Sequence, residues 1–267
     1  MITLYHNNGS SCSQKVRFVL EEKKIPWQSK ELNLREGDQF NEEYVALNHK
    51  AVVPTLVHNE DIIIESAIIC QYLDEFFDGP SLSPEDALGR ANMRQWIQPI
   101  DEHLHADISV ISHAIVFADE IRAANNTDEK LNNYLSKIPD PDKRNLRREL
   151  ITKSTKAGPF KSSLLRYKKF VSRVNDALEN RPYILGNDLT IADVVCLPYV
   201  LRFQHLNQSN LLNELPEIQR WFERMSDTDG YRLGIEKWFH HKGIDNMMRA
   251  GEEKRDSIKQ AWDEANS

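Results

Sequence analysis

The pattern of apolar residues changes once along this chain, at the breaker-rich residues 78–84. Before them, short β-branched runs alternate with segments of helical period, whereas the clearest apolar runs after them recur three and four positions apart. The order β-α-β-α-β-β-α, with a right-handed crossover and a closing hairpin, predicts a thioredoxin-like α/β domain at the N-terminus. The elements predicted there are residues 2–5, 14–24, 27–34, 38–47, 51–57, 62–64 and a helix opened by Glu65-Ser66.

The second half of the chain is predicted to be all-helical. Residues 119–160 are polar and are predicted to be an insertion with partial helix of its own, and residues 240–267 a charged, poorly periodic tail compatible with a surface helix. The predicted organisation is therefore a domain at 1–78, a linker at 79–85 and a domain at 86–267. The clearest helical period is carried by Ile97, Ile100, Leu104, Ile108, Ile111 and Ile115.

One local signal marks the start of a helix in the last third of the chain. Thr190-Ile191-Ala192-Asp193 predicts a capping box, in which the Thr190 side chain accepts from an orphan amide and Asp193 reaches back.

Composition narrows the class of protein. The net charge of −7 disfavours a nucleic-acid binder, which usually has a basic surplus. No stretch of about 18 apolar residues occurs and the first residues lack a signal-peptide pattern, so we expect a cytoplasmic protein with no membrane contact. The cysteines, Cys12, Cys70 and Cys196, show neither CxxC nor metal-ligand spacing. No metal site is predicted, and Cys70 and Cys196 are expected to pack in the core.

Five motifs stand in an order that resembles the cytosolic glutathione transferase superfamily over residues 1–76 and 183–225. The resemblance implies a thioredoxin-like first domain, an all-α helical bundle as the second, glutathione as the cofactor and a homodimer. The motifs are Leu4-Tyr5-His6, Ser10-Ser11-Cys12-Ser13-x-Lys15-Val16-Arg17, Val53-Pro54-Thr55-Leu56, Glu65-Ser66-x-Ile68-Ile69-x-x-Tyr72-Leu73 and Tyr183-Ile184-Leu185-Gly186-Asn187-x-Leu189-Thr190-Ile191-Ala192-Asp193.

The resemblance extends to several subclasses. The serine and cysteine run at 10–13 with Val16-Arg17 resembles the zeta class, whose chemistry includes maleylacetoacetate isomerisation. The segment 48–57 is similar to tetrachlorohydroquinone dehalogenase, and the long insertion with Lys137-Ile138-Pro139 resembles the bacterial β-etherases. Residues 13–17 with a long insertion also resemble ganglioside-induced differentiation-associated proteins.

The resemblance implies that the reagent is the thiolate of glutathione. A thiol is mostly protonated at neutral pH, and the N-terminus of the first helix favours an anion through its orphan amides and dipole. Ser10, Ser11 or Ser13 would donate a hydrogen bond to the sulfur; Ser10 matches the zeta and dehalogenase serine, and Ser13 the β-etherase serine. The alternative is that these serines only cap the helix.

Cys12 offers a second chemistry, because a helix N-terminus lowers the pKa of a cysteine and makes it nucleophilic. In dehalogenase-like enzymes the matching cysteine resolves a glutathione conjugate through a mixed disulfide. The alternative is a small, partly buried side chain.

The remaining site residues are also implied by the resemblance. A cis Pro54 would turn the N–H and C=O of Val53 toward the cysteinyl backbone of glutathione, like one more strand. The amide and hydroxyl of Ser66 suit the α-carboxylate of the γ-glutamyl group, and Glu65 suits its ammonium.

The glycine carboxylate is where the sequence departs from the pattern. Many relatives carry Lys or Gln just before the Val-Pro pair, and this chain has Val52. Lys50 or His49 would then supply the cation, with help from Gln39.

The predicted function is a glutathione transferase with a detoxification-type activity on a small hydrophobic electrophile, bound between the two domains. The reaction would be conjugation, β-aryl ether cleavage, dehalogenation or isomerisation. Two alternatives are a non-catalytic interaction protein that kept the fold and a thiol transferase that depends on Cys12.

Overall fold

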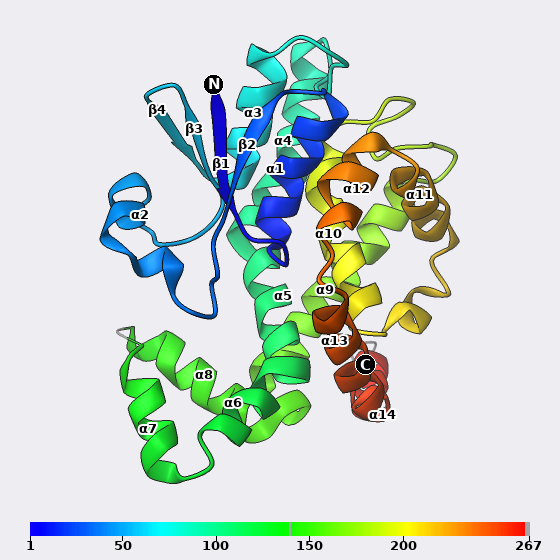
Figure 1. The fold of residues 1–267 in the computed structure, drawn as a ribbon. Coiled ribbons are helices and arrows are strands. Elements are labelled where there is room, and N and C mark those ends of the chain that lie inside the picture. Colours follow the sequence, from blue (N-terminus) through cyan, green and yellow to red (C-terminus); the bar gives the residue numbers. More distant parts are fainter. Residues whose placement is uncertain (139, 265–267) are drawn as a thin grey trace. The chain divides into compact units, whose positions relative to one another are not determined.

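The computed structural model describes residues 1–138 and 140–264, so the predicted motif residue Pro139 and tail residues 265–267 lie outside the described residues. The chain forms two compact units that interleave along the sequence. Unit 1 comprises residues 1–101, 177–200 and 217–240, and unit 2 comprises residues 102–176, 201–216 and those from 241 on. Figure 1 labels the helices and strands of both. The domain boundaries at 79–85 stay a prediction.

Four strands form the mixed sheet of unit 1, in the order β2-β1-β3-β4. β1 is parallel to β2 and antiparallel to β3, and β3 forms a hairpin with β4, so the thioredoxin-like α/β prediction is confirmed. In Figure 1 the sheet lies between α2 on one side and α1 with α3 on the other. The strands are β1 (Ile2–His6), β2 (Trp27–Glu31), β3 (Thr55–His58) and β4 (Asp61–Ile64).

Two strands are shorter than predicted. β3 begins only at Thr55, because Pro54 has no N–H for the ladder and the Val52 carbonyl already accepts from Tyr44 Oη at 2.5 Å. β2 ends at Glu31, because Asn33 starts a turn in which its N–H donates to the Asp38 carboxylate at 2.8 Å.

The helices of unit 1 follow the predicted order. α1 starts three residues earlier than predicted, because Ser10 is its N-cap. Apolar faces of α1 and α3 are buried in the core, including Cys70; Cys196 on α10 is buried as well, so both buried-cysteine predictions are confirmed. The helices are α1 (Ser11–Glu22), η1 (Asp38–Phe40), α2 (Glu42–Leu47), α3 (Ser66–Phe76), α4 (Ala87–Pro99), α11 (Pro216–Ser226), α12 (Asp229–Gly234) and η6 (Glu236–Trp238).

The predicted capping box opens α10 (Ile191–His205), which runs from unit 1 into unit 2. The buried Asp193 carboxylate reaches back to the Thr190 N–H at 3.0 Å, as predicted. The Thr190 hydroxyl differs from the prediction, because it donates to that carboxylate at 3.0 Å and does not cap an amide. Asp193 also accepts from Ile184 N and Trp221 Nε1, both at 2.9 Å, and so ties three segments of unit 1 together.

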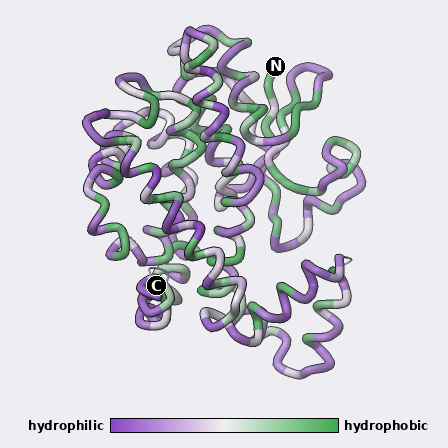
Figure 2. The backbone as a smooth tube through the Cα atoms, turned by 180° about the vertical axis from the view of Figure 1, so that it is seen from behind, coloured by the Kyte–Doolittle hydropathy of each residue, from purple (hydrophilic) through white to green (hydrophobic). Residues whose placement is uncertain are grey.

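The predicted run of helical period begins with Ile97 and Ile100 at the end of the first segment of unit 1 and continues in unit 2, and it is continuous but not uniform. Two π-helical turns, η2 (Ile100–Leu104) and η3 (His113–Phe117), separate α4, α5 (His105–Ser112) and α6 (Ala118–Ala124). The insertion at 119–160 is more helical than predicted, because Thr127 and Asp140 cap its helices, and its tube is mostly hydrophilic in Figure 2. The remaining helices are α7 (Asp128–Ser136), α8 (Pro141–Lys153), η4 (Ser154–Lys156), α9 (Gly158–Ala177) and η5 (Ser209–Leu212).

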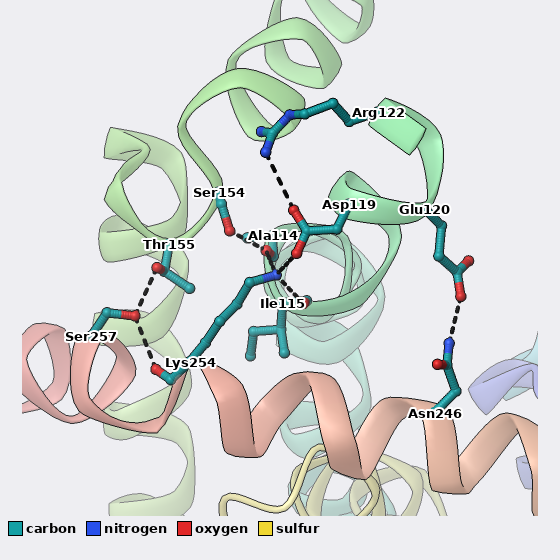
Figure 3. A network of polar contacts seen from close by, with 10 residues as sticks. All are labelled: Ala114, Ile115, Asp119, Glu120, Arg122, Ser154, Thr155, Asn246, Lys254 and Ser257. Atoms are coloured by element: carbon teal, nitrogen blue, oxygen red, sulfur yellow. Dashed lines mark hydrogen bonds and ion pairs between the residues drawn. The ribbon is translucent and has the colours of Figure 1, made fainter. Parts of the chain in front are cut away.

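The tail is helical, as the prediction allowed, but its buried residues correct the prediction of a poorly periodic surface segment. It forms two helices, α13 (His241–Glu253) and α14 (Arg255–Glu264), and Ile258 and Trp262 are buried. Lys254 Nζ donates to Ile115 O of η3 and to Asp119, both at 2.5 Å (Figure 3). This packing could not be predicted from the charged composition of the tail. In the sequence, a lysine that donates to helix carbonyls cannot be distinguished from a lysine in solvent.

Among the described residues no helix is both long enough and apolar enough to cross a membrane.

Candidate functional site

Three segments with predicted site residues meet at one edge of the unit 1 sheet. The strand register pairs Tyr5 with Thr55 and Thr55 with Ile64. The loop after β1, the Val53-Pro54 bond before β3 and the Glu65-Ser66 step after β4 therefore leave the sheet at the same edge. Residues far apart in sequence are thus brought to one place by the order of the strands.

The first segment is the start of α1, where the serines have different environments. The Ser10 side chain is half-buried and its Oγ accepts from the Ser13 N–H at 3.2 Å, so its proton remains available to a ligand. Ser13 is fully buried and its Oγ accepts from the Asn7 N–H at 3.3 Å. Ser11 is also buried, whereas Cys12 is half-buried and not in a disulfide. Ser10 and Cys12 are therefore the two side chains of this run that a ligand can reach.

The loop that leads into α1 is held by Arg17, a residue that the sequence reasoning missed. Arg17 is fully buried, and its Nη1 and Nη2 donate to the carbonyls of Asn7 at 3.0 Å and Asn8 at 3.2 Å. Its Nε donates to the carbonyl of Gly234, at the end of α12, at 2.7 Å. Burial lowers the pKa of Arg17 to about 9, and Glu31 opposes that shift.

His6 completes this network as a neutral ring. Its Nδ1 accepts from Arg17 Nη1 at 3.0 Å, which leaves Nε2–H to donate to Ser29 Oγ at 2.8 Å. Burial, and next the Arg17 charge, lower the pKa of His6 to about 3. Trp238 packs edge-on against the His6 ring at 4.7 Å and faces the Arg17 guanidinium at 5.3 Å. The signal in the sequence was an arginine next to the apolar stripe of a buried helix.

Glycine permits the contact between α1 and α12. A Cβ on Gly234 would lie 2.6 Å from the Arg17 carbonyl oxygen, and a Cβ on Gly230 would lie 2.7 Å from the Phe18 ring. The Gly230 N–H also donates to Glu22 at 2.8 Å. The two helices therefore pack so closely that α12 lies directly against α1 and the arginine that holds the loop before it.

The second segment contains the predicted cis bond. The Val53-Pro54 peptide is cis, as predicted. Tyr44 and Asn48 fix its surroundings, because both hydrogen-bond the Val52 carbonyl and the Thr55 hydroxyl. Within the described part of the chain, neither the N–H nor the C=O of Val53 has a hydrogen-bond partner. This leaves one unpaired strand edge that can accept an extended peptide.

The third segment brings two predicted residues into direct contact. Lys50 Nζ lies 2.5 Å from Glu65 Oε1, and both side chains are about half exposed. Glu65 has a φ of 70°, an uncommon value for a residue with a Cβ, and Ser66 follows as the buried first residue of α3. The proposed cation and the proposed anion of the ligand site therefore neutralise each other in the free protein.

Gln39 and His49 are the least defined of the predicted residues. The Gln39 amide donates to the Leu34 carbonyl at 3.4 Å, and its Oε1 is buried without a partner in the described residues. His49 is exposed. The structure places both in the stretch between β2 and β3, and among the described residues no hydrogen bond or ion pair joins either side chain to Lys50.

Both halves of the chain match one family. The Glutathione S-transferase N-terminal domain matches residues 9–75, and the Glutathione S-transferase C-terminal domain matches residues 154–229. Together the two matches cover more than half of the chain.

Individual proteins agree with this match. Protein LigF of Sphingobium sp. (strain NBRC 103272 / SYK-6) is 24% identical over 95% of this chain and 98% of its own. The crystal structure of that beta-etherase superposes with a TM-score of 0.76 at 22% identity, over 88% of this chain and 99% of its own. The tetrachloro-p-hydroquinone reductive dehalogenase of Sphingobium chlorophenolicum is 25% identical over 84% of this chain and 91% of its own.

A third protein is known with the cosubstrate in place. The crystal structure of a glutathione transferase homologue from Sulfitobacter with bound glutathione has a TM-score of 0.64 at 18% identity, over 89% of this chain and 98% of its own. These matches confirm the resemblance drawn from the motifs. The chain belongs to the glutathione S-transferase family, a family of enzymes whose cosubstrate is glutathione.

Proposed function

We propose that this chain binds glutathione at the sheet edge of unit 1 and directs its thiolate at a small hydrophobic electrophile. The observation that carries the proposal is the meeting of three segments there: an open helix N-terminus, an unpaired strand edge at Val53, and a Lys50–Glu65 pair. The helix amides and the free proton of Ser10 would stabilise the sulfur anion. Ser11 and Ser13 are too buried to reach a ligand directly, so we assign the thiol contact to Ser10, with Cys12 beside it.

The rest of the tripeptide follows the same edge. The Val53 N–H and C=O would pair with the cysteinyl backbone, and Pro54 would hold that geometry. The amide and hydroxyl of Ser66 would take the γ-glutamyl carboxylate, at the N-terminus of α3. Glu65 would take the ammonium.

Glutathione binding would have to break the ion pair between Lys50 and Glu65. An ammonium that reaches Glu65 must replace Lys50, which is then free to meet the glycine carboxylate, with His49 or Gln39 proposed to assist. A half-exposed ion pair contributes about 0–1 kcal/mol, so the exchange costs little. The Lys50–Glu65 pair of the free protein therefore does not prevent glutathione binding. It requires a ligand with an ammonium for Glu65 and a carboxylate for Lys50.

Calorimetric titration with glutathione and with its glycine monoethyl ester tests this assignment. We expect wild type to bind glutathione more tightly than the ester, and Lys50→Met to bind both alike, because it has lost the cation for the free carboxylate. Lys30→Met, an exposed lysine on β2, is the matched control and is expected to keep the preference. No saturable binding by wild type at millimolar glutathione would refute the proposed site.

We propose β-aryl ether cleavage as the first reaction to assay, supported by the likeness to LigF over nearly the whole chain. In that reaction the glutathione thiolate forms a C–S bond to the carbon that bears the ether oxygen, and the phenolate leaves. Conjugation, isomerisation and dehalogenation are the other members of the same class.

The half-buried Cys12 supports a second candidate, a Cys12-dependent thiol transferase. Cys12→Ala separates the two, because it is expected to abolish thiol–disulfide exchange and to spare conjugation. Equal loss of both activities would contradict this division.

A third candidate is an interaction protein that kept the fold without its chemistry. The apolar Val52 in place of a cation and the capped helices of the insertion favour it. It predicts no glutathione binding and a stable protein partner.

We also propose a cytoplasmic homodimer with domains at 1–78 and 86–267 joined by 79–85. The support for the dimer is the set of exposed apolar side chains on α3 and β4, which are Ile62, Ile68 and Phe76.

A further inference from the structure

A second buried cation of α1 lies one turn after Cys12. Lys15 is fully buried, and the i, i+3 spacing puts it on the same side of the helix as Cys12. Long side chains in helices lean toward the N-terminus, so the Lys15 ammonium extends toward the first turn.

The groups around this ammonium come from three further elements. Its Nζ lies 3.5 Å from Asp101 Oδ1, just beyond α4, and 5.1 Å from the ring of Tyr199 on α10. The Tyr199 hydroxyl is also its hydrogen-bond partner. From α3, Cys70 and Asp74 lie close enough to interact electrostatically with this cluster.

Two of these neighbours carry no charge at neutral pH. Burial raises the pKa of Tyr199 and of Cys70, so the phenol and the thiol keep their protons. Asp74 is already engaged, because its carboxylate pairs with Lys23 at 3.0 Å. For Lys15 itself burial lowers the pKa, but Tyr199, Cys12 and Asp101 raise it by more, so the ammonium stays charged.

The charge of Lys15 is less compensated than that of Lys23, the other buried lysine of the same region. Lys23 has the Asp74 carboxylate at 3.0 Å and two carbonyls within 3.3 Å. Lys15 has one carboxylate at 3.5 Å, and the side chain of that aspartate is 39% exposed. A buried cation that is incompletely neutralised favours the ionised form of the nearest acidic group.

We propose that Lys15 is a positioning residue that holds a positive charge beneath the start of α1 and thereby favours the thiolate form of Cys12. By the same field it favours the sulfur anion of glutathione bound there; this second part rests on the proposed function. Helix amides stabilise the anion from its N-terminal side, and Lys15 does so from inside the protein.

Alkylation of Cys12 by iodoacetamide without glutathione tests the charge effect independently of ligand binding. Only the thiolate reacts, and Cys70 and Cys196 are fully buried, so the rate against pH gives the midpoint for Cys12, with the modified peptide confirmed by mass spectrometry. We expect Lys15→Met to raise the midpoint by about one pH unit or more, a tenfold slower reaction at neutral pH. Lys15→Arg is expected to retain most of the effect.

Two further variants make the test specific. Asp101→Asn removes the opposing charge and is expected to lower the midpoint, the direction opposite to Lys15→Met. Lys23→Met removes a buried lysine near the other end of α1 and is expected to leave the midpoint unchanged while it lowers stability. If Lys15→Met folds poorly, Asp101→Asn still decides: an unchanged or raised midpoint overturns the proposal, as does equal behaviour of the two lysine variants. Failure of the glutathione titration alone overturns the proposed function and leaves these midpoints standing.

Discussion

Replacing Arg17 by methionine removes the guanidinium donors that tie the loop before α1 to its surroundings. The carbonyls of Asn8 and Gly234 and the Nδ1 atom of His6 each lose the Arg17 donor, and the Asn7 carbonyl keeps only the Ser10 N–H at 3.3 Å. A buried acceptor left unpaired costs about 1–3 kcal/mol, but relaxation and entering water recover part of the sum. We therefore expect the free energy of unfolding to fall by about 3–5 kcal/mol, as for other broken buried charge networks.

The matched control is Arg232→Met on α12, which belongs to the helix that packs on α1. Arg232 is exposed and pairs only with Asp229 at 3.3 Å, so its loss is expected to cost less than about 1 kcal/mol. Urea unfolding at one pH compares the two variants directly. A difference of less than about 1 kcal/mol between them would refute the reasoning, because it would mean that Arg17 donates no more than a surface arginine does.

Catalysis gives a second readout for Arg17. Because the loop carries Ser10, its displacement is expected to lower kcat about tenfold or more, at a temperature where the variant is still folded.

Three further predictions concern other parts of the molecule. Lys254→Met leaves the η3 carbonyls without their ammonium donor and is expected to expose the tail to proteolysis after residue 240, measured by limited trypsin digestion against wild type. For His6, the folded pKa of about 3 lies below the usual 6.5, so the unfolded state binds more protons and stability is lost as pH falls below 6.5; His6→Gln is expected to reduce this slope by up to about 1.4 kcal/mol per pH unit in urea titrations. Ile68→Glu is expected to convert the proposed dimer into a monomer in sedimentation measurements; an unchanged mass would place the interface elsewhere.

Local chemistry explains what could be predicted from the sequence. The Ser10 cap and the hydrogen bond from the Thr190 N–H to Asp193 each depend on residues within a few positions of one another. The cis Val53-Pro54 bond was implied by the family resemblance. The thioredoxin-like strand order follows from the alternation of short periods in the first 76 residues.

Non-local contacts explain what could not. Arg17 meets Gly234 across 217 positions, and no pattern near either residue indicates the other. The tail was misread for the same reason, because Gly251 approaches the Leu206 carbonyl so closely that a Cβ there would lie 1.7 Å from it. The contact between Lys50 and Glu65 also depends on the fold, since the resemblance implies that both residues bind the ligand.

Arg17 is held by the Gly234 carbonyl and by Trp238, both of which lie late in the sequence. This order affects when the proposed site can be completed during synthesis of the chain. The residues proposed to contact glutathione leave the ribosome early, within the first 66 positions. Gly234 and Trp238, which hold Arg17 in place, leave it about 170 positions later, after most of the chain has emerged. A nascent chain can therefore pair its strands long before its α1 loop is locked, and glutathione binding is expected to appear only once residue 238 has cleared the exit tunnel.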